Sequence, residues 1–288
     1  MPMMQQGDLE VAYEVVGEGR PWVITPGGRF SKDYGGVREL AHALAGLGNK
    51  VLIYDRLNCG ASAVHFAGPS ESVLQADSLA ELLRQLDFGP TVIAGGSGGA
   101  RISLLTAARH PDVASGVAIW WTSGGVFGNM SLGPHYCGGS IVAAWNGTMA
   151  DVAALPEWAE VIERNPRNRD RFLAMERARF LVTLQDWMHA YCACGDPLVP
   201  GLTDEEAAAM GVPTLVFRSG ESDIHHTRAT SERLAAELPN ARLVEPPWGD
   251  REWLERQDAM AAGEALFARW QLLAPQLHAG ADEVGIDQ

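Results

Sequence analysis

The feature that most constrains the fold is an apolar run that breaks at a Gly-x-Ser-x-Gly turn. Residues 91–94 read Thr-Val-Ile-Ala, the turn is Gly95-Gly-Ser97-Gly-Gly99, and a helical pattern follows. A serine at such a strand-to-helix corner sits on a strained turn, and glycines on either side let the backbone segments pack closely. The free N–H groups and positive dipole end of the following helix point to the same place. This pattern predicts that Ser97 is a nucleophile.

Short β-rich runs alternate with helical patterns on both sides of this turn. That alternation is typical of a mostly parallel sheet with helices on both faces. Glycine and proline turns separate the runs. We expect strands at residues 11–16, 22–25, 51–54, 91–94, 116–121, 213–217 and 242–245.

The strand rhythm disappears between residues 122 and 200. This stretch is rich in Trp, Met and Ala, and we expect helices at 141–154, 158–164 and 168–191. The sequence therefore predicts a core of residues 1–121 and 201–288 with a helical insertion at 122–200. Near the end of the chain we expect one helix over 252–273 and a loose tail over 274–288.

Composition restricts the partners. The 288 residues suit one domain with an inserted subdomain. Lys and Arg total 22 against 36 Asp and Glu, and the net charge of −14 argues against binding nucleic acid. The start lacks the basic and apolar regions of a leader, and no run of 18 apolar residues follows. We expect a soluble cytoplasmic protein with no membrane partner.

The four cysteines, Cys59, Cys137, Cys192 and Cys194, are too few and too scattered for a disulfide scaffold. Cys192 and Cys194 could form half of a metal site, but no second pair with ligand spacing follows. We expect reduced thiols and no metal.

Four local patterns carry a resemblance to a known family. They are Pro26-Gly27-Gly28, Asp55-Arg-x-Asn-x-Gly-x-Ser62, the turn around Ser97, and Gly220-Glu-Ser-Asp223. In this order, over roughly residues 8–272, the chain resembles the α/β-hydrolase superfamily. The resemblance implies a mostly parallel α/β-hydrolase sheet with helices on both faces, and it makes the insertion a helical cap. It does not specify a substrate.

The resemblance also implies roles for particular residues. The backbone N–H of Gly98 and that of Gly28 or Arg29 would form an oxyanion hole, which holds negative charge as it develops on a carbonyl oxygen. Pro26 stands where the commonest family form has a histidine, but the donors are backbone groups. Asp223 follows an apolar strand at the position of the triad acid.

The histidine that serves the family as general base is missing from its usual place. After the last expected strand the chain reads Pro246-Pro-Trp-Gly-Asp250, so Asp250 occupies roughly that position. A carboxylate with a pKa near 3.9 is a poor match for taking a serine proton at neutral pH. His225 and His226 follow Asp223 closely, and either could replace the base or serve only the loop. His135 and His189 in the insertion are further candidates, whereas His42, His65, His110 and His278 read as surface residues.

Tryptophans are the candidates for a pocket wall. Trp248, beside Asp250, and Trp121, at the end of an expected strand, suit an apolar or ring-containing substrate. Others could line the pocket or pack the cap onto the sheet, namely Trp120, Trp145, Trp158 and Trp187.

Three functions stay open on these residues. The first is a cofactor-free enzyme that acts on the carbonyl of a small, fairly apolar metabolite and hydrolyses an ester, a lactone or a carbon–carbon bond through Ser97. The second is a non-hydrolytic lyase, cyclase or isomerase that uses the same pocket, with Asp250 or Asp223 moving protons. The third is a ligand-binding protein that has lost its chemistry. A homo-oligomer is possible in each case.

Overall fold

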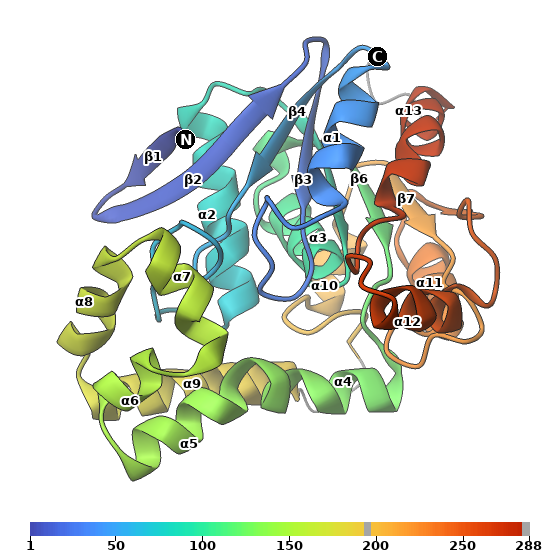
Figure 1. Ribbon diagram of the computed structural model, residues 1–288. Helices are drawn as coiled ribbons and strands as arrows, with labels where there is room; N and C mark the ends of the chain where they lie inside the picture. The colour runs from blue at the N-terminus through green and yellow to red at the C-terminus, as the bar shows by residue number, and fades with distance from the viewer. Residues whose placement is uncertain (193–196, 284–288) are drawn as a thin grey trace.

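The computed structural model describes residues 1–192 and 197–283, so Cys194 lies outside the described residues. Its centre is an eight-stranded sheet with the order β1-β2-β4-β3-β5-β6-β7-β8 (Figure 1). The strands from β3 to β8 are parallel to their neighbours, and β1 and β2 pair antiparallel. The expected mostly parallel sheet is confirmed. The strands are β1 Met3–Gln6, β2 Leu9–Val16, β3 Arg20–Thr25, β4 Asn49–Tyr54, β5 Thr91–Gly96, β6 Ala114–Trp120, β7 Thr214–Phe217 and β8 Ala241–Val244.

Helices cover both faces of the sheet. The helices α2, α3 and α11 bury leucines and alanines in the core against one face. On the other face, α1 and α13 lie side by side (Figure 1). The core helices are α1 Val37–Ala45, α2 Glu71–Gln85, α3 Gly98–Arg109, α10 Asp204–Ala208, α11 Arg228–Glu237, α12 Glu252–Ala261 and α13 Ala274–Glu283.

The C-terminal region differs from the expectation of one long helix and a loose tail. α12 ends at Ala261, and Gly263 follows with φ of +93°, a conformation that favours glycine and stops a helix. The next helix, α13, extends over the tail, and its Leu277 and Ala281 are fully buried in the sheet's core. Burial of these apolar side chains against the sheet explains why this part of the tail is ordered.

Between β6 and α10 the described chain is helical, as expected. Two of the three expected helices are divided: one ends where Gly147 follows α5, and another breaks before Glu176, whose carboxylate caps α9. The limits 122 and 200 of the insertion stay a prediction. The segments are α4 Gly125–Gly133, a π-helical turn η2 Pro134–Gly138, α5 Gly139–Asn146, α6 Met149–Ala153, α7 Ala159–Arg164, α8 Arg167–Ala174 and α9 Arg177–Tyr191.

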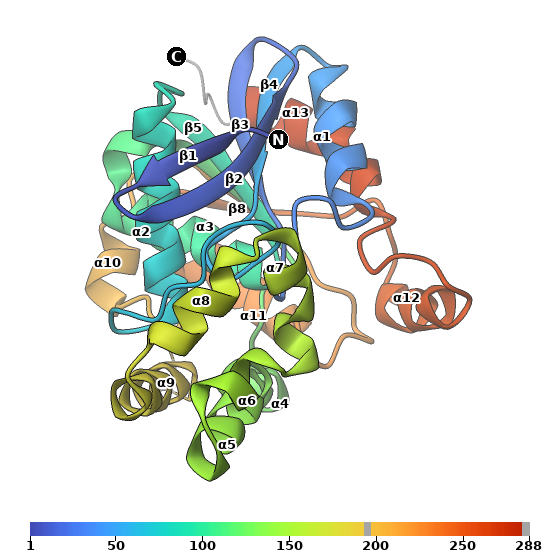
Figure 2. The same ribbon diagram turned by 60° about the vertical axis from the view of Figure 1, so that its left-hand side comes forward.

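This insertion has its own apolar core and polar links to the sheet. Trp158, Phe172 and Trp187 are fully buried within it. Figure 2 shows α8 beneath the β1–β2 hairpin, where Arg171 pairs with Glu10 of β2 at 3.0 Å. The buried Asn168 of α8 donates to the Ser62 carbonyl oxygen at 2.9 Å. These contacts fix one side of the insertion to the core.

No helix in the described part of the chain combines the length and apolar character needed to cross a bilayer. Cys59, Cys137 and Cys192 are free thiols. Over residues 1–192 and 197–283, no three His, Cys, Asp or Glu side chains gather in a way that could hold a metal ion.

Candidate active site

Ser97 stands on the tight corner between β5 and α3. Its φ of 56° and ψ of −120° lie outside the regions that a residue with a side chain normally adopts. A Cβ at Gly99 would lie 2.0 Å from the Thr25 carbonyl oxygen, and one at Gly95 would lie 2.6 Å from the Gly99 carbonyl carbon. Glycine is therefore required on both sides of the corner, for the reason that the sequence pattern indicated.

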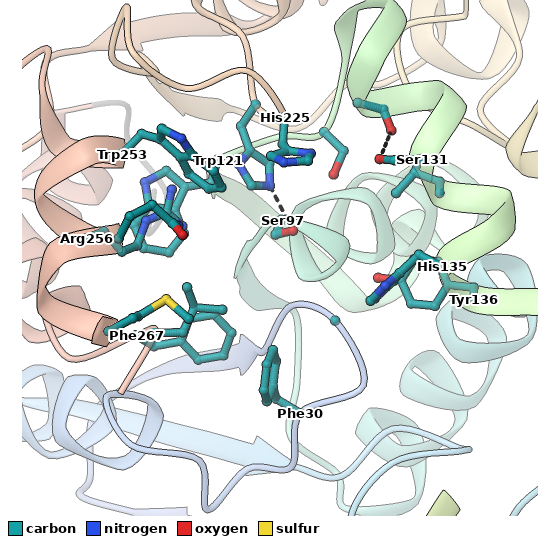
Figure 3. Close-up of a pocket in the computed structure, with 18 residues that line it drawn as sticks. Phe30, Ser97, Trp121, Ser131, His135, Tyr136, His225, Trp253, Arg256 and Phe267 are labelled. Atoms are coloured by element: carbon teal, nitrogen blue, oxygen red, sulfur yellow. Dashed lines mark hydrogen bonds between the residues drawn. The ribbon is translucent and has the colours of Figure 1, made fainter. Parts of the chain in front are cut away.

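Ser97, His226 and Asp223 form a hydrogen-bonded chain. His226 Nε2 lies 3.0 Å from Ser97 Oγ, a contact drawn as a dashed line in Figure 3. His226 Nδ1 lies 2.9 Å from Asp223 Oδ2. Asp223 and His226 are both buried, and only 4% and 7% of their surfaces are exposed. This is the geometry of a nucleophile, a base and an orienting acid.

Local structure fixes the loop that carries the acid and the base. The other carboxylate oxygen of Asp223 accepts hydrogen bonds from the backbone N–H groups of His225 and His226, each at 2.9 Å. Thr227 then caps α11, because its side chain accepts from the Thr230 N–H. His226 is thus held between an Asp-centred turn and a helix start, which restricts its ring to one orientation.

Arg256 of α12 supports the acid from the far side. Its guanidinium donates to Asp223 Oδ2 at 2.9 Å and lies over the rings of Trp121 and Trp253, 3.8 and 4.8 Å from their centroids. Burial alone would raise the pKa of Asp223, but the hydrogen bond from His226 and the charges of His226 and Arg256 outweigh it and hold that pKa below its usual value. The contact spans 33 residues of sequence, and no pattern in the chain indicated it.

Glu252, one turn earlier on α12, shares the same guanidinium. Arg256 Nε lies 3.2 Å from Glu252 Oε1, and both side chains are buried. Burial raises the pKa of Glu252 to about 7, although the positive charge of Arg256 opposes the shift. Asp223, Arg256 and Glu252 thus form a buried ionic chain behind His226.

Asp250 lies away from this site. Its side chain is 57% exposed and forms an ion pair with Arg228 on the surface. Together with Trp248 it lines a separate polar hollow, and neither residue is among those that line the cavity at Ser97. The expectation that Asp250 stands beside the nucleophile does not match this placement, since its carboxylate is held in solvent by an arginine. Trp248 instead packs behind Trp121, with ring centroids 5.6 Å apart.

The glycine loop after β3 faces the same point as the start of α3. Gly28 has a φ of +51° and lines the cavity. A Cβ built on Gly98 would lie 3.4 Å from the Gly28 nitrogen. Within residues 1–192 and 197–283, neither Gly28 N–H nor Gly98 N–H donates a hydrogen bond to the protein. The side chain of Arg29 turns away and pairs with Glu71. Two free donors beside Ser97 suit an oxyanion.

The cavity above Ser97 has a volume of about 390 Å³ and mainly aromatic and apolar walls (Figure 3). Trp121 is part of the wall, as expected. The other expected tryptophans are not: Trp120 and Trp158 are buried elsewhere, Trp187 packs inside the insertion, and Trp145 is exposed. The aromatic and apolar lining residues are Phe30, Trp121, Leu132, Tyr136, Trp253, Met260, Leu266 and Phe267.

Two more of the candidate histidines reach this cavity. His225 lies at its edge, between the rings of Phe127 and Trp253, and burial lowers its pKa. His135 lines the opposite wall, and burial lowers its pKa as well. Neither ring hydrogen-bonds to Ser97, and His189 is not part of the wall. Of the candidates for the base, the structure brings His226 to the nucleophile.

No protein-family model matches the chain, and no curated protein matches its sequence. Solved structures do match its fold. Est816, titled an N-acyl homoserine lactone degrading enzyme, is 20% identical with a TM-score of 0.59, over 97% of this chain and 99% of that one. The enol-lactonase from Burkholderia xenovorans LB400 is 25% identical with a TM-score of 0.54, over 91% and 97%. A putative lipase from Acinetobacter baumannii AYE is 17% identical with a TM-score of 0.64, over 100% and 92%.

Proposed function

We propose that this chain, a member of the α/β-hydrolase superfamily, hydrolyses an ester or a lactone of a small, largely apolar molecule. Ser97 is the nucleophile, His226 the general base and Asp223 the acid that orients it. The observation that carries the proposal is the unbroken chain of contacts at 3.0 and 2.9 Å from Ser97 through His226 to Asp223, open to an aromatic cavity.

The first half of the reaction forms an acyl-enzyme. His226 Nε2 takes the Ser97 proton while Oγ bonds to the substrate carbonyl carbon, and the carbonyl π electrons move onto its oxygen. The N–H groups of Gly28 and Gly98 donate to that oxygen. When the C=O bond re-forms, the bond to the leaving alkoxide breaks, and His226 gives its proton to the alkoxide oxygen. For a lactone the alcohol stays attached to the acyl chain.

Water completes the second half. His226 takes a proton from water as the water oxygen bonds to the acyl carbon, and the bond to Ser97 Oγ breaks as the proton returns to that oxygen. Arg256 keeps Asp223 ionised throughout, because its charge disfavours protonation of the carboxylate. The ionised carboxylate stabilises the positive imidazolium in both halves.

The walls of the cavity support the choice of substrate class. Phe30 and Phe267 face the space beside Ser97, while Trp121 and Trp253 form another side (Figure 3). Such surfaces bind apolar chains and rings through burial of their area. The named neighbours that degrade acylated or enol lactones have the same fold, which makes lactones the first substrates to test.

The test is hydrolysis of a panel of p-nitrophenyl esters and γ-lactones with increasing acyl length. We expect turnover by the wild type, incorporation of one ¹⁸O from labelled water into the acid, and a rate lower by about 10⁴ to 10⁶ in Ser97→Ala. Unchanged melting temperature would show that this variant is folded. Equal turnover by wild type and Ser97→Ala would contradict the proposal.

The other two hypotheses lose their motive. The non-hydrolytic one arose because no histidine follows the last strand, but His226 now supplies an imidazole at Ser97. The ligand-binding one would return if bound esters and lactones stayed intact through prolonged incubation with the wild type.

A further inference from the structure

A tyrosine hydroxyl from the insertion lies beside the two backbone donors of the candidate oxyanion hole. Tyr136 belongs to the π-helical turn η2 and lines the cavity with Ser97 and Gly28. A Cβ built on Gly98 would lie 3.1 Å from Tyr136 Oη and 3.4 Å from the Gly28 nitrogen. The hydroxyl and the two N–H groups therefore meet around one small volume next to the nucleophile.

The hydroxyl has no hydrogen-bond partner in the described part of the protein, although only 5% of the residue is exposed. A buried hydroxyl without a partner costs free energy, since it has lost its hydrogen bonds to water. It is free to donate to an oxygen that enters the cavity. In Figure 3 the Tyr136 side chain lies across the cavity from Trp121 and Arg256.

The ring that carries this hydroxyl is held on several sides. Tyr191 of α9 stacks on it, with centroids 5.0 Å apart and planes 18° from parallel. Arg29 donates to the Tyr136 carbonyl oxygen at 2.7 Å. Because Arg29 directly follows Gly28 in the chain, one side chain joins the glycine loop to the residue that presents the hydroxyl. The three donors are thus positioned together, as preorganised stabilisation requires.

The surrounding charges favour negative charge at this point. Three arginines lie close behind the cavity wall and are largely buried: Arg29, Arg56 and Arg101. Arg29 and Arg101 are 5.5 and 5.7 Å from the centroid of the Tyr136 ring. Glu71 is the carboxylate that pairs with Arg29. A cluster with more arginines than carboxylates stabilises an oxyanion nearby.

We infer that Tyr136 is a third oxyanion donor, a catalytic residue supplied by the insertion rather than by the sheet. Its O–H donates to the substrate carbonyl oxygen as negative charge develops there, and the proton stays on the phenol. This inference rests on the proposed function, because it requires a carbonyl substrate attacked by Ser97. It also means that the hole is complete only when η2 is seated over the glycine loop.

The test compares Tyr136→Phe with Tyr191→Phe. Both substitutions remove one hydroxyl from neighbouring stacked rings, but the Tyr191 hydroxyl donates to Glu71 and does not line the cavity. With a p-nitrophenyl ester that the wild type hydrolyses, we expect Tyr136→Phe to lower kcat by about 10- to 100-fold, with KM changed less than about 3-fold. For Tyr191→Phe we expect kcat within about 3-fold of the wild type.

A second readout separates oxyanion stabilisation from loss of packing. A trifluoromethyl ketone forms a hemiketal with a serine, whose oxygen occupies the oxyanion position. We expect Tyr136→Phe to weaken binding of this inhibitor by the same factor as it lowers kcat/KM, while a non-reactive alcohol analogue binds as it does to the wild type. A wild-type kcat in Tyr136→Phe, or an equal loss in both variants, would overturn the inference. Absence of turnover in the wild type would instead overturn the proposed function, and the inference with it.

Discussion

The loops that follow β7 and β8 leave the same edge of the sheet and carry similar polar residues, yet they are placed very differently. The loop after β7 buries Asp223 and His226 against Ser97. The loop after β8 leaves Asp250 more than half exposed, in an ion pair with Arg228. An arginine contacts each aspartate, but Arg256 is buried between two tryptophan rings and Arg228 lies near the surface. Burial, rather than residue type, distinguishes a working carboxylate from a solvated one.

The comparison also teaches that acid and base need not come from different strands. In this chain Asp223 and His226 are three residues apart, and a turn and a helix cap hold them in contact. The imidazole still reaches Ser97 over 129 positions of sequence. What the chemistry needs is convergence at Ser97, and one short loop supplies two of the three groups.

Removing the imidazole should have the largest effect on this comparison. His226→Ala leaves Ser97 without a base, so we expect kcat for the best ester or lactone to fall by about 10⁴ to 10⁶. Steady-state kinetics on the folded variant measures it. His225→Ala is the matched control, because its ring does not contact Ser97, and we expect a loss below about 10-fold. Equal losses in the two variants would contradict the assignment of His226.

Replacing the buried arginine should have the next largest effect. Arg256→Met removes the donor to Asp223, and we expect kcat to fall by about 10²-fold because the acid and the imidazole lose their fixed geometry. The charge of Arg256 lowers the pKa of Asp223, so the pH below which activity is lost should rise in the variant. A kcat–pH profile measures both effects. Arg228→Met is the control, and an identical profile in the two variants would break the contrast between the loops.

Glu252 should make the stability of the protein depend on pH. Its pKa is raised from 4.5 to about 7, so between these values the folded protein binds a proton that the unfolded chain has lost. The free energy of unfolding should therefore fall as pH rises from about 4.5 to 7, by up to about 3 kcal/mol. Urea unfolding of wild type and Glu252→Gln at pH 5 and pH 8 measures the difference. The same pH dependence in both proteins would contradict the origin of the shift.

Asp250→Ala should have the smallest effect. Its carboxylate is solvated, and exposed ion pairs contribute about 0 to 1 kcal/mol to stability. We expect kcat and KM within about 2-fold of the wild type. A loss of 100-fold or more would return the loop after β8 to the reaction.

Local patterns predicted the parts of this molecule that depend on neighbouring residues. The turn at Ser97 and the parallel sheet follow from glycine spacing and from alternating strands and helices. His226 was one of two candidates, since spacing places both histidines in the loop but cannot say which ring turns inward. The contact of Arg256 with Asp223 and the position of Tyr136 beside Gly98 join distant segments, and no local pattern encodes them. The helix α13 was missed because its order comes from packing against the sheet.

The most direct test of the central claim is the rate at which a fluorophosphonate labels Ser97 at pH 8 in four proteins. They are the wild type, Ser97→Ala, His226→Ala and Asp250→Ala. The geometry predicts rapid labelling of wild type and Asp250→Ala at the same rate, labelling slower by at least about 10³-fold in His226→Ala, and none in Ser97→Ala. Labelling of His226→Ala at the wild-type rate, or its loss in Asp250→Ala, would contradict the claim that His226 activates Ser97.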